Sequence, residues 1–248
     1  MIARCVVGCM LIGLTAATRM DPLPAPVLWA WERPEDLRFA GPEVTIAVLA
    51  GTVWLSARGV SVRPRLQPAV VLASQLVVGV VHVEIDRVSP PDWTVEQRAE
   101  TAAVVLALLK NPRFVAAQID FEVRASRRQV LLDVLTDVRA GLPAGHRLSM
   151  TALASWCDTE TWIEAAPVDE VVPMLFRMGH GGEAIRRRLG DGGDFRQARC
   201  RTSIGIATDT PPDGLPADGW PVGRTVWIFD PRAWTADDLV SVRDRLGR

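Results

Sequence analysis

The strongest constraint on the fold is a series of eight short apolar segments, most of them separated by helical patterns. The segments are rich in β-branched residues and bounded by Gly, Pro or Asp, which is typical of parallel strands buried on both faces. They therefore predict strands over Val27–Trp31, Val44–Ala50, Leu76–Glu84, Val115–Phe121, Arg147–Leu153, Val171–Phe176, Ser203–Thr208 and Thr225–Phe229.

The segments between these strands predict helices. Thr94 is a favourable N-cap, Gln97 follows it by three residues, and Asn111-Pro112 ends that helix. The predicted helices cover Thr94–Lys110, Ser126–Ala140, Asp158–Ala166 and Ala236–Leu246.

Strand and helix alternation repeated eight times in 248 residues favours an α/β fold, a single-domain (β/α)8 TIM barrel, over an open sheet. Between the second and third predicted strands, residues 51–68 alternate around Ala57-Arg58-Gly59. This pattern predicts a β-hairpin insertion after strand 2.

Composition excludes several function classes. Hydrophobic residues make up 48% of the chain, which is enough for a sizeable core. The formal net charge is -1 and no basic stripe dominates, so we expect no nucleic-acid partner. Arg186-Arg187-Arg188 is interpreted as a solvated helix face. The chain has neither a GxGxxG nor a Walker motif, so we expect no cofactor. It has only three histidines and no CxxC motif, so we expect no metal.

The amino terminus has the pattern of a signal peptide over residues 1–17: Arg4, the largely apolar Cys5–Leu14, then Thr15-Ala16-Ala17. A Pro-rich spacer over residues 18–26 then leads into a barrel domain over 27–248. We expect export to the periplasm or cell exterior, with no stable membrane insertion after processing. Lipid attachment at Cys9, after Val6-Val7-Gly8, and a retained anchor are the alternatives.

Cleavage near Ala17 leaves two cysteines, Cys157 and Cys200. In an oxidising compartment they can pair as a disulfide. The sequence does not give the distance between them in the fold, so it leaves open whether the disulfide forms.

Active sites of such barrels lie at the carboxyl ends of the strands. Side chains alternate along a strand, so Gln118, Asp120 and Glu122 share one face, as do His82, Glu84 and Asp86. Two neighbouring strands with polar faces are unusual in a buried sheet, because unpaired buried polar groups are unfavourable. Further candidates at strand ends are Trp29, Trp31, Glu32, Asp209, Trp227 and Asp230.

Asp120 and Glu122 lie about 7 Å apart along the strand, at roughly 3.3 Å per residue. Mutual repulsion can keep one carboxyl protonated while the other is ionised, as glycoside cleavage requires. We therefore assign catalytic roles to Glu122 and Asp120. The alternative is a structural one, in which Arg33, Arg124 or Arg177 neutralises the pair.

The remaining strand-end residues are assigned to substrate binding, while a purely structural role stays open for each. Tryptophan indoles can stack on sugar rings or simply pack in a wall, and His82 can be a satisfied rim histidine. The assigned residues are Trp29, Trp31, Glu32, His82, Glu84, Gln118, Arg177, Asp209 and Trp227.

Several of these motifs together resemble an uncharacterised bacterial family, a domain of unknown function whose fold is expected to be a glycoside-hydrolase-like barrel. The resemblance covers nearly the whole chain after the leader. It lies in Trp29–Glu32, Val81–Glu84, Gln118–Glu122, Leu148–Cys157, Val172–Gly179 and Ser203–Asp209.

More distantly, Ile119-Asp120-Phe121-Glu122 is similar to the end of the fourth strand in chitinase-like barrels. That resemblance implies that Glu122 is the general acid, Asp120 its partner and Trp227 the tryptophan at the floor of the sugar site. The chain departs from the pattern at Val115 and Gln118, where that family has aspartates. It also contains no tyrosine, with Phe176 or Met178 in the region of the sixth-strand tyrosine.

We therefore expect an exported glycoside-hydrolase-like protein that acts on a polysaccharide or oligosaccharide. A non-catalytic carbohydrate-binding barrel is the main alternative. A metal-dependent hydrolase using His82, Glu84, Asp86 and Asp120 is a third hypothesis, disfavoured because only one histidine lies at a strand end.

Overall fold

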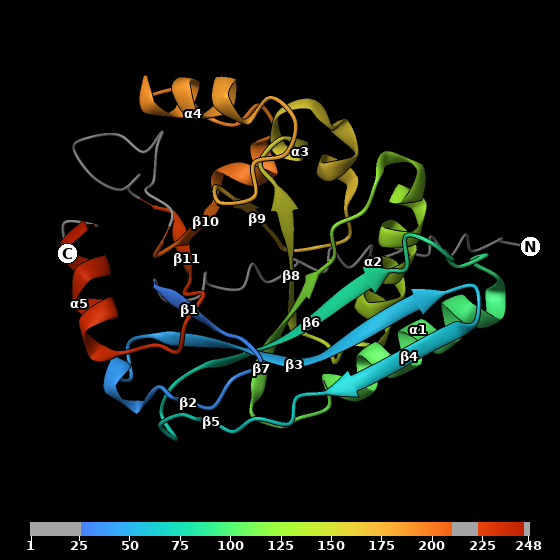
Figure 1. The fold of residues 1–248 in the computed structure, drawn as a ribbon, viewed down its shortest axis with the longest axis horizontal. Helices are drawn as coiled ribbons and strands as arrows, with labels where there is room; N and C mark the ends of the chain where they lie inside the picture. Colours follow the sequence, from blue (N-terminus) through green and yellow to red (C-terminus); the bar gives the residue numbers. More distant parts are fainter. Residues whose placement is uncertain (1–25, 210–222, 246–248) are drawn as a thin grey trace, which may run out of the picture.

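The eight predicted strands close into a parallel barrel, which confirms the (β/α)8 architecture (Figure 1). The structure, a computed structural model, describes residues 26–209 and 223–245. Around the barrel the order is β1-β11-β10-β9-β8-β7-β6-β3, and β1 pairs with β3 to close the ring. The strands are β1 (Val27–Ala30), β3 (Thr45–Ser56), β6 (Val77–Ile85), β7 (Phe114–Asp120), β8 (Arg147–Leu153), β9 (Glu170–Met174), β10 (Ser203–Ala207) and β11 (Thr225–Phe229).

Within the described residues, helices follow β6, β7, β8, β9 and β11. The helix α1 is capped by Thr94, whose hydroxyl accepts a 3.3 Å hydrogen bond from the Gln97 amide. The predicted helix over Asp158–Ala166 is replaced by two shorter elements, α3 and η3. The helical elements are α1 (Val95–Leu108), η2 (Ala125–Arg127), α2 (Arg128–Gly141), α3 (Trp156–Thr159), η3 (Thr161–Ala165), α4 (Gly182–Gly190), η4 (Ala198–Arg201) and α5 (Ala236–Arg245).

The first two barrel strands are followed by short extended segments. After β1 come β2 (Glu35–Asp36) and η1 (Arg38–Ala40), and β2 pairs with β5 (Ala69–Val70). Strand β3 continues to Ser56, beyond the predicted end at Ala50, and pairs antiparallel with β4 (Gly59–Pro64). The antiparallel pairing expected within residues 51–68 thus begins as an extension of a barrel strand, with α1 beside β4 (Figure 1).

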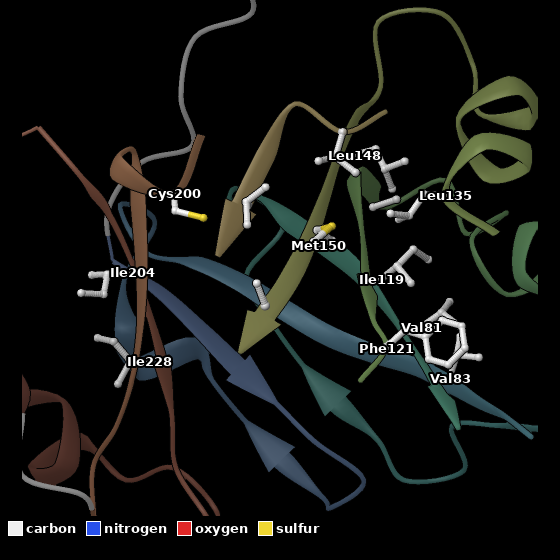
Figure 2. Close-up of a cluster of buried hydrophobic side chains, with 14 of the residues drawn as sticks. Val81, Val83, Ile119, Phe121, Leu135, Leu148, Met150, Cys200, Ile204 and Ile228 are labelled. Atoms are coloured by element: carbon white, nitrogen blue, oxygen red, sulfur yellow. The ribbon is translucent and has the colours of Figure 1, made fainter. Parts of the chain in front are cut away.

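Alternation along the strands sorts the side chains into two layers. Outward residues pack against the helices, as Figure 2 shows for Val81, Ile119 and Leu148 with Leu135 of α2. Inward apolar residues form a separate cluster that includes Trp29 and Trp227. Gly205 faces this interior, where a Cβ would come within 3.1 Å of the Trp29 ring. The absent side chain therefore makes room for the indole.

Polar side chains close the amino-terminal end of the barrel. The buried carboxylate of Glu170 accepts hydrogen bonds from the Trp227 indole (3.0 Å) and from Ser203, and it forms an ion pair with Arg147 (3.4 Å). These contacts compensate the burial of the charge. They also fix Trp227 as the floor on which Trp29 packs, with ring centroids 5.4 Å apart.

The predicted signal peptide and nearly all of the Pro-rich spacer lie outside the described residues. Within residues 26–209 and 223–245, no helix has the length and apolarity needed to cross a membrane.

A disulfide joins Cys157 of α3 to Cys200 of η4, with a Cα–Cα distance of 5.8 Å. Both cysteines are fully buried in the outer core. The bond links two connections that lie 43 residues apart in the chain. It therefore holds together the segments that follow β8 and β9.

Loss of this disulfide should lower the free energy of unfolding by about 4 kcal/mol, because a loop of this length is no longer constrained in the unfolded chain. Chemical denaturation of the oxidised protein and of the Cys157→Ala/Cys200→Ala variant measures the difference. Reductant should destabilise the parent and leave the double variant unaffected. Equal stability of the two proteins would contradict a stabilising role.

Candidate active site

The inward-facing residues at the carboxyl ends of the strands surround a cavity of about 270 Å³ at the mouth of the barrel. This volume is near the lower end of the range of small-molecule sites, roughly 300–1,000 Å³. The cavity is lined by Trp29, Trp31, His82, Asp120, Glu122, Thr151, Met174, Phe176, Arg177 and Phe229.

Four aromatic rings form one wall of the cavity. Phe176 and Phe229 stack with their centroids 5.7 Å apart, and Trp29 meets Phe176 edge-on at 6.2 Å. Trp31 stands edge-on to both Phe229 and His82. This wall is continuous and apolar, and it ends at the imidazole of His82.

The backbone around Trp31 is fixed by a partly buried arginine. Arg65, from the connection after β4, donates hydrogen bonds to the carbonyls of Ala30 (3.0 Å), Trp31 and Arg33. Glu32 accepts hydrogen bonds from the amides of Leu66 and Gln67. The loop after β1 is thus tied to the loop after β4, so the position of Trp31 is preorganised.

A histidine held between two carboxylates forms the polar wall. Nδ1 of His82 lies 2.7 Å from Oδ2 of Asp120, and Nε2 lies 2.8 Å from Oε1 of Glu84. The hydroxyl of Thr151 donates to the second oxygen of Asp120 at 2.5 Å. The Trp54 indole donates to Glu84 at 3.2 Å. These bonds connect residues from β3, β6, β7 and β8.

The charges of this cluster follow from its contacts. Burial alone would lower the pKa of His82, but the hydrogen bonds and charges of Asp120 and Glu84 raise it to about 9. Burial would raise the pKa of Asp120, but His82, Thr151 and Arg177 together lower it below its usual value. At neutral pH, His82 is therefore an imidazolium and Asp120 a carboxylate.

The pKa of Glu122 is raised, whereas that of Asp120 is lowered. Burial raises its pKa, the negative charge of Asp120 adds to this effect, and Arg177 only partly opposes it. Nε of Arg177 lies 3.1 Å from Oε1 of Glu122, in a pair whose side chains are 61% and 35% exposed. Two neighbouring carboxyl groups are thus driven toward different protonation states, as acid/base catalysis requires.

Most of the predicted site residues meet at this mouth. Trp29, Trp31, His82, Asp120, Glu122 and Arg177 line the cavity, and Glu84 borders it through His82. Of the arginines considered as neutralising partners, Arg177 pairs with Glu122, whereas Arg33 pairs with Glu35. Arg124 forms no ion pair within the described part of the chain.

Four residues assigned to substrate binding do not line this cavity. Gln118 is fully buried, where it accepts from the Trp29 indole (2.7 Å) and donates to Ser149 (3.2 Å). Trp227 is also fully buried, one layer below the cavity. Glu32 faces the backbone of Leu66 and Gln67, and the exposed Asp209 does not line the cavity. None of the four is placed to contact a ligand in this cavity.

Sequence reasoning missed Thr151, Met174 and Phe229 as lining residues. Thr151 lies two residues after Ser149 on β8, so alternation was the signal that pointed to it. The aromatic and thioether side chains looked like ordinary core residues, because apolar strand ends carry no distinctive pattern.

Other features of the described residues offer less chemistry. A cavity of about 330 Å³ lies between β3, β5 and the end of α1, but its lining has no carboxylate. Its two arginines, Arg65 and Arg113, donate to backbone carbonyls. Within residues 26–209 and 223–245, no group of three or more His, Cys, Asp or Glu side chains could hold a metal ion.

Comparisons with protein-family models, with curated proteins and with solved structures gave no match. The fold and site therefore define the class of the protein, a (β/α)8 barrel with acidic and aromatic walls at its mouth. The resemblances to the bacterial family and to chitinase-like barrels stay hypotheses.

Stability should fall as the pH rises from about 6.5 to about 9. Because the pKa of His82 is raised from 6.5 to about 9 in the fold, its stabilising contribution is complete below the lower value and lost through the higher one. The loss is about 3 kcal/mol on the scale of 1.36 kcal/mol per pKa unit. Urea unfolding across this pH range measures it.

The His82→Gln variant should flatten this pH dependence. His180→Gln is the matched control, because the exposed His180 has no hydrogen bond or ion pair within residues 26–209 and 223–245. An unchanged slope in His82→Gln would show that the imidazolium does not stabilise the fold.

Proposed function

We propose that the protein is a glycoside-hydrolase-like enzyme that cleaves a polysaccharide or glycoconjugate by carboxylate acid/base chemistry. One observation carries this proposal: in a single cavity with an aromatic wall, the pKa of Glu122 is raised and the pKa of Asp120 is lowered. Aromatic rings suit the apolar faces of sugars, and a protonated carboxyl beside an ionised one suits cleavage of the glycosidic bond.

In this mechanism, Glu122 donates its proton to the leaving glycosidic oxygen while the bond to the anomeric carbon breaks. The ionised Asp120, fixed by His82 and Thr151, stabilises the positive charge that develops on the sugar ring. Water supplies the hydroxyl of the new reducing end, and its released proton restores the acid. The guanidinium of Arg177, 3.1 Å from Glu122, lowers the pKa of that carboxyl and so eases release of its proton.

A specific observation also favours the alternative, a non-catalytic carbohydrate-binding barrel. Both carboxylates have protein partners: Asp120 accepts from His82 and Thr151, and Glu122 pairs with Arg177. Groups held in this way can serve as fixed hydrogen-bond acceptors for sugar hydroxyls without any transfer of protons.

We further propose that the protein is exported to the periplasm or cell exterior. The buried Cys157–Cys200 disulfide supports this, because disulfides persist in oxidising compartments and are rare in the cytosol. The signal-peptide pattern of residues 1–17 gives separate support.

The Glu122→Gln variant should lose at least about 100-fold in hydrolysis, because it removes the proton donor and keeps the shape of the side chain. Release of reducing ends from a panel of polysaccharides measures the activity, and thermal unfolding checks the fold. If a folded variant cleaves as fast as the parent, Glu122 is not the acid.

The pH profile gives a second check on this role. Activity should decline as the pH rises through the raised pKa of Glu122, since only the protonated carboxyl can donate. Arg177 lowers that pKa, so Arg177→Gln should move the alkaline limb to higher pH. A limb that stays in place or moves to lower pH would contradict the assignment.

Trp31→Ala should weaken oligosaccharide binding about tenfold, equivalent to about 1.4 kcal/mol, because it removes the ring that joins the aromatic wall to His82. Calorimetry measures the affinity, and Trp31→Phe is the control that keeps a ring. Binding lost in Trp31→Ala without any hydrolysis by the parent would favour the non-catalytic barrel. Equal affinity of all three proteins would remove Trp31 from the site.

A further inference from the structure

A larger groove of about 780 Å³ adjoins the cavity and shares His82, Glu122 and Arg177 with it. It runs between the β3–β4 extension and the loops that follow β6 and β7. We call it the arginine groove, because its lining includes Arg58, Arg87, Arg124, Arg127 and Arg177. These arginines come from four separate stretches of the chain, so the fold gathers them on one surface.

The acidic residues of the groove already form hydrogen bonds or ion pairs with other groups of the protein. Glu84 bonds to His82 and Trp54, and Glu122 pairs with Arg177. Asp86 accepts hydrogen bonds from the backbone amides of Val88 (2.8 Å) and Ser89 (3.1 Å). The lining carboxylates are therefore held by protein groups, and two of the three are held by a cation.

Four of the five arginines, by contrast, form no ion pair within the described residues. Within residues 26–209 and 223–245, no carboxylate lies within ion-pair distance of Arg58, Arg87, Arg124 or Arg127. Arg127 donates to the Pro91 carbonyl at 3.0 Å, which fixes its side chain beside the groove. Arg87 and Arg124 are exposed. With His82 charged, the cations of the groove outnumber its carboxylates.

We propose that the arginine groove binds the flanking units of an anionic glycan, whose carboxylate or sulfate groups pair with its arginines while a neighbouring sugar ring enters the cavity. Planar guanidinium groups match the geometry of such anions. Because the groove and the cavity are continuous, one glycan chain can lie across both. The inference names a substrate class and rests on the proposed function for the part played by the cavity.

Calorimetric titration of the purified Glu122→Gln protein tests the proposal, since binding is then read without cleavage. Oligogalacturonate supplies carboxylates, a heparin oligosaccharide of similar length supplies sulfates, and a cello-oligosaccharide is the neutral control. At least one of the two anionic glycans should bind about tenfold or more tightly than the neutral one. Its affinity should fall as sodium chloride rises, because salt screens exposed charges.

The matched variants remove two positive charges each. Arg87→Gln/Arg124→Gln changes two exposed arginines of the groove, and Arg186→Gln/Arg187→Gln changes two on α4, outside it. The groove variant should lose about tenfold in affinity for the anionic glycan and show a weaker salt dependence. The α4 variant should match the parent.

Three outcomes would overturn the proposal: equal binding of neutral and anionic glycans, equal losses in the two double variants, or tighter binding of a single-stranded oligonucleotide than of either anionic glycan. Groove-dependent binding of an anionic glycan that the parent protein does not cleave would support the groove while contradicting the proposed hydrolysis. The failure of one is thereby distinguished from the failure of the other.

Discussion

The alternation of side chains along eight parallel strands determines the organisation of this protein. It directs Val81, Ile119 and Leu148 outward against the helices and directs Trp29, His82 and Asp120 into the interior. An unpaired polar group deep in the barrel is unfavourable, and the buried Gln118 and Glu170 are both hydrogen-bonded. Interior residues at the carboxyl ends meet solvent, so charged groups can gather there.

The same rule explains why similar residues have different roles at different depths. Glu170 near the amino-terminal end is a buried acceptor for Ser203 and Trp227. Gln118 in the middle joins Trp29 to Ser149. Asp120, two residues further along β7, reaches the cavity and contacts His82. The floor and the middle layer support the residues that line the cavity above them.

Much of the fold and part of the site could be predicted from the sequence. Buried parallel strands have a strong apolar signal, and a two-residue period correctly grouped Asp120 with Glu122 and His82 with Glu84. The depth of each residue could not be predicted, because it depends on how neighbouring strands are staggered. Trp227, for example, is fully buried in the floor below Trp29 and does not reach the cavity.

Contacts between segments that are distant in the chain could not be predicted from the sequence either. The choice of Arg177 rather than Arg33 or Arg124 as the partner of Glu122 depends on where the loops end in space. The extension of β3 to Ser56 depends on its antiparallel partner β4. The gathering of arginines from four stretches beside the cavity became visible only with the fold.

Asp120 and Glu122 line one cavity, and their surroundings displace their carboxyl pKa values in opposite directions. Carboxyl carbon-13 NMR titration tests this displacement directly, with resonances assigned through Glu122→Gln and Asp120→Asn. We expect the titration midpoint of Glu122 to lie above its ordinary value of 4.5 and that of Asp120 to lie below 3.8. A Glu122 midpoint at or below its ordinary value, or an Asp120 that titrates above it, would contradict the account.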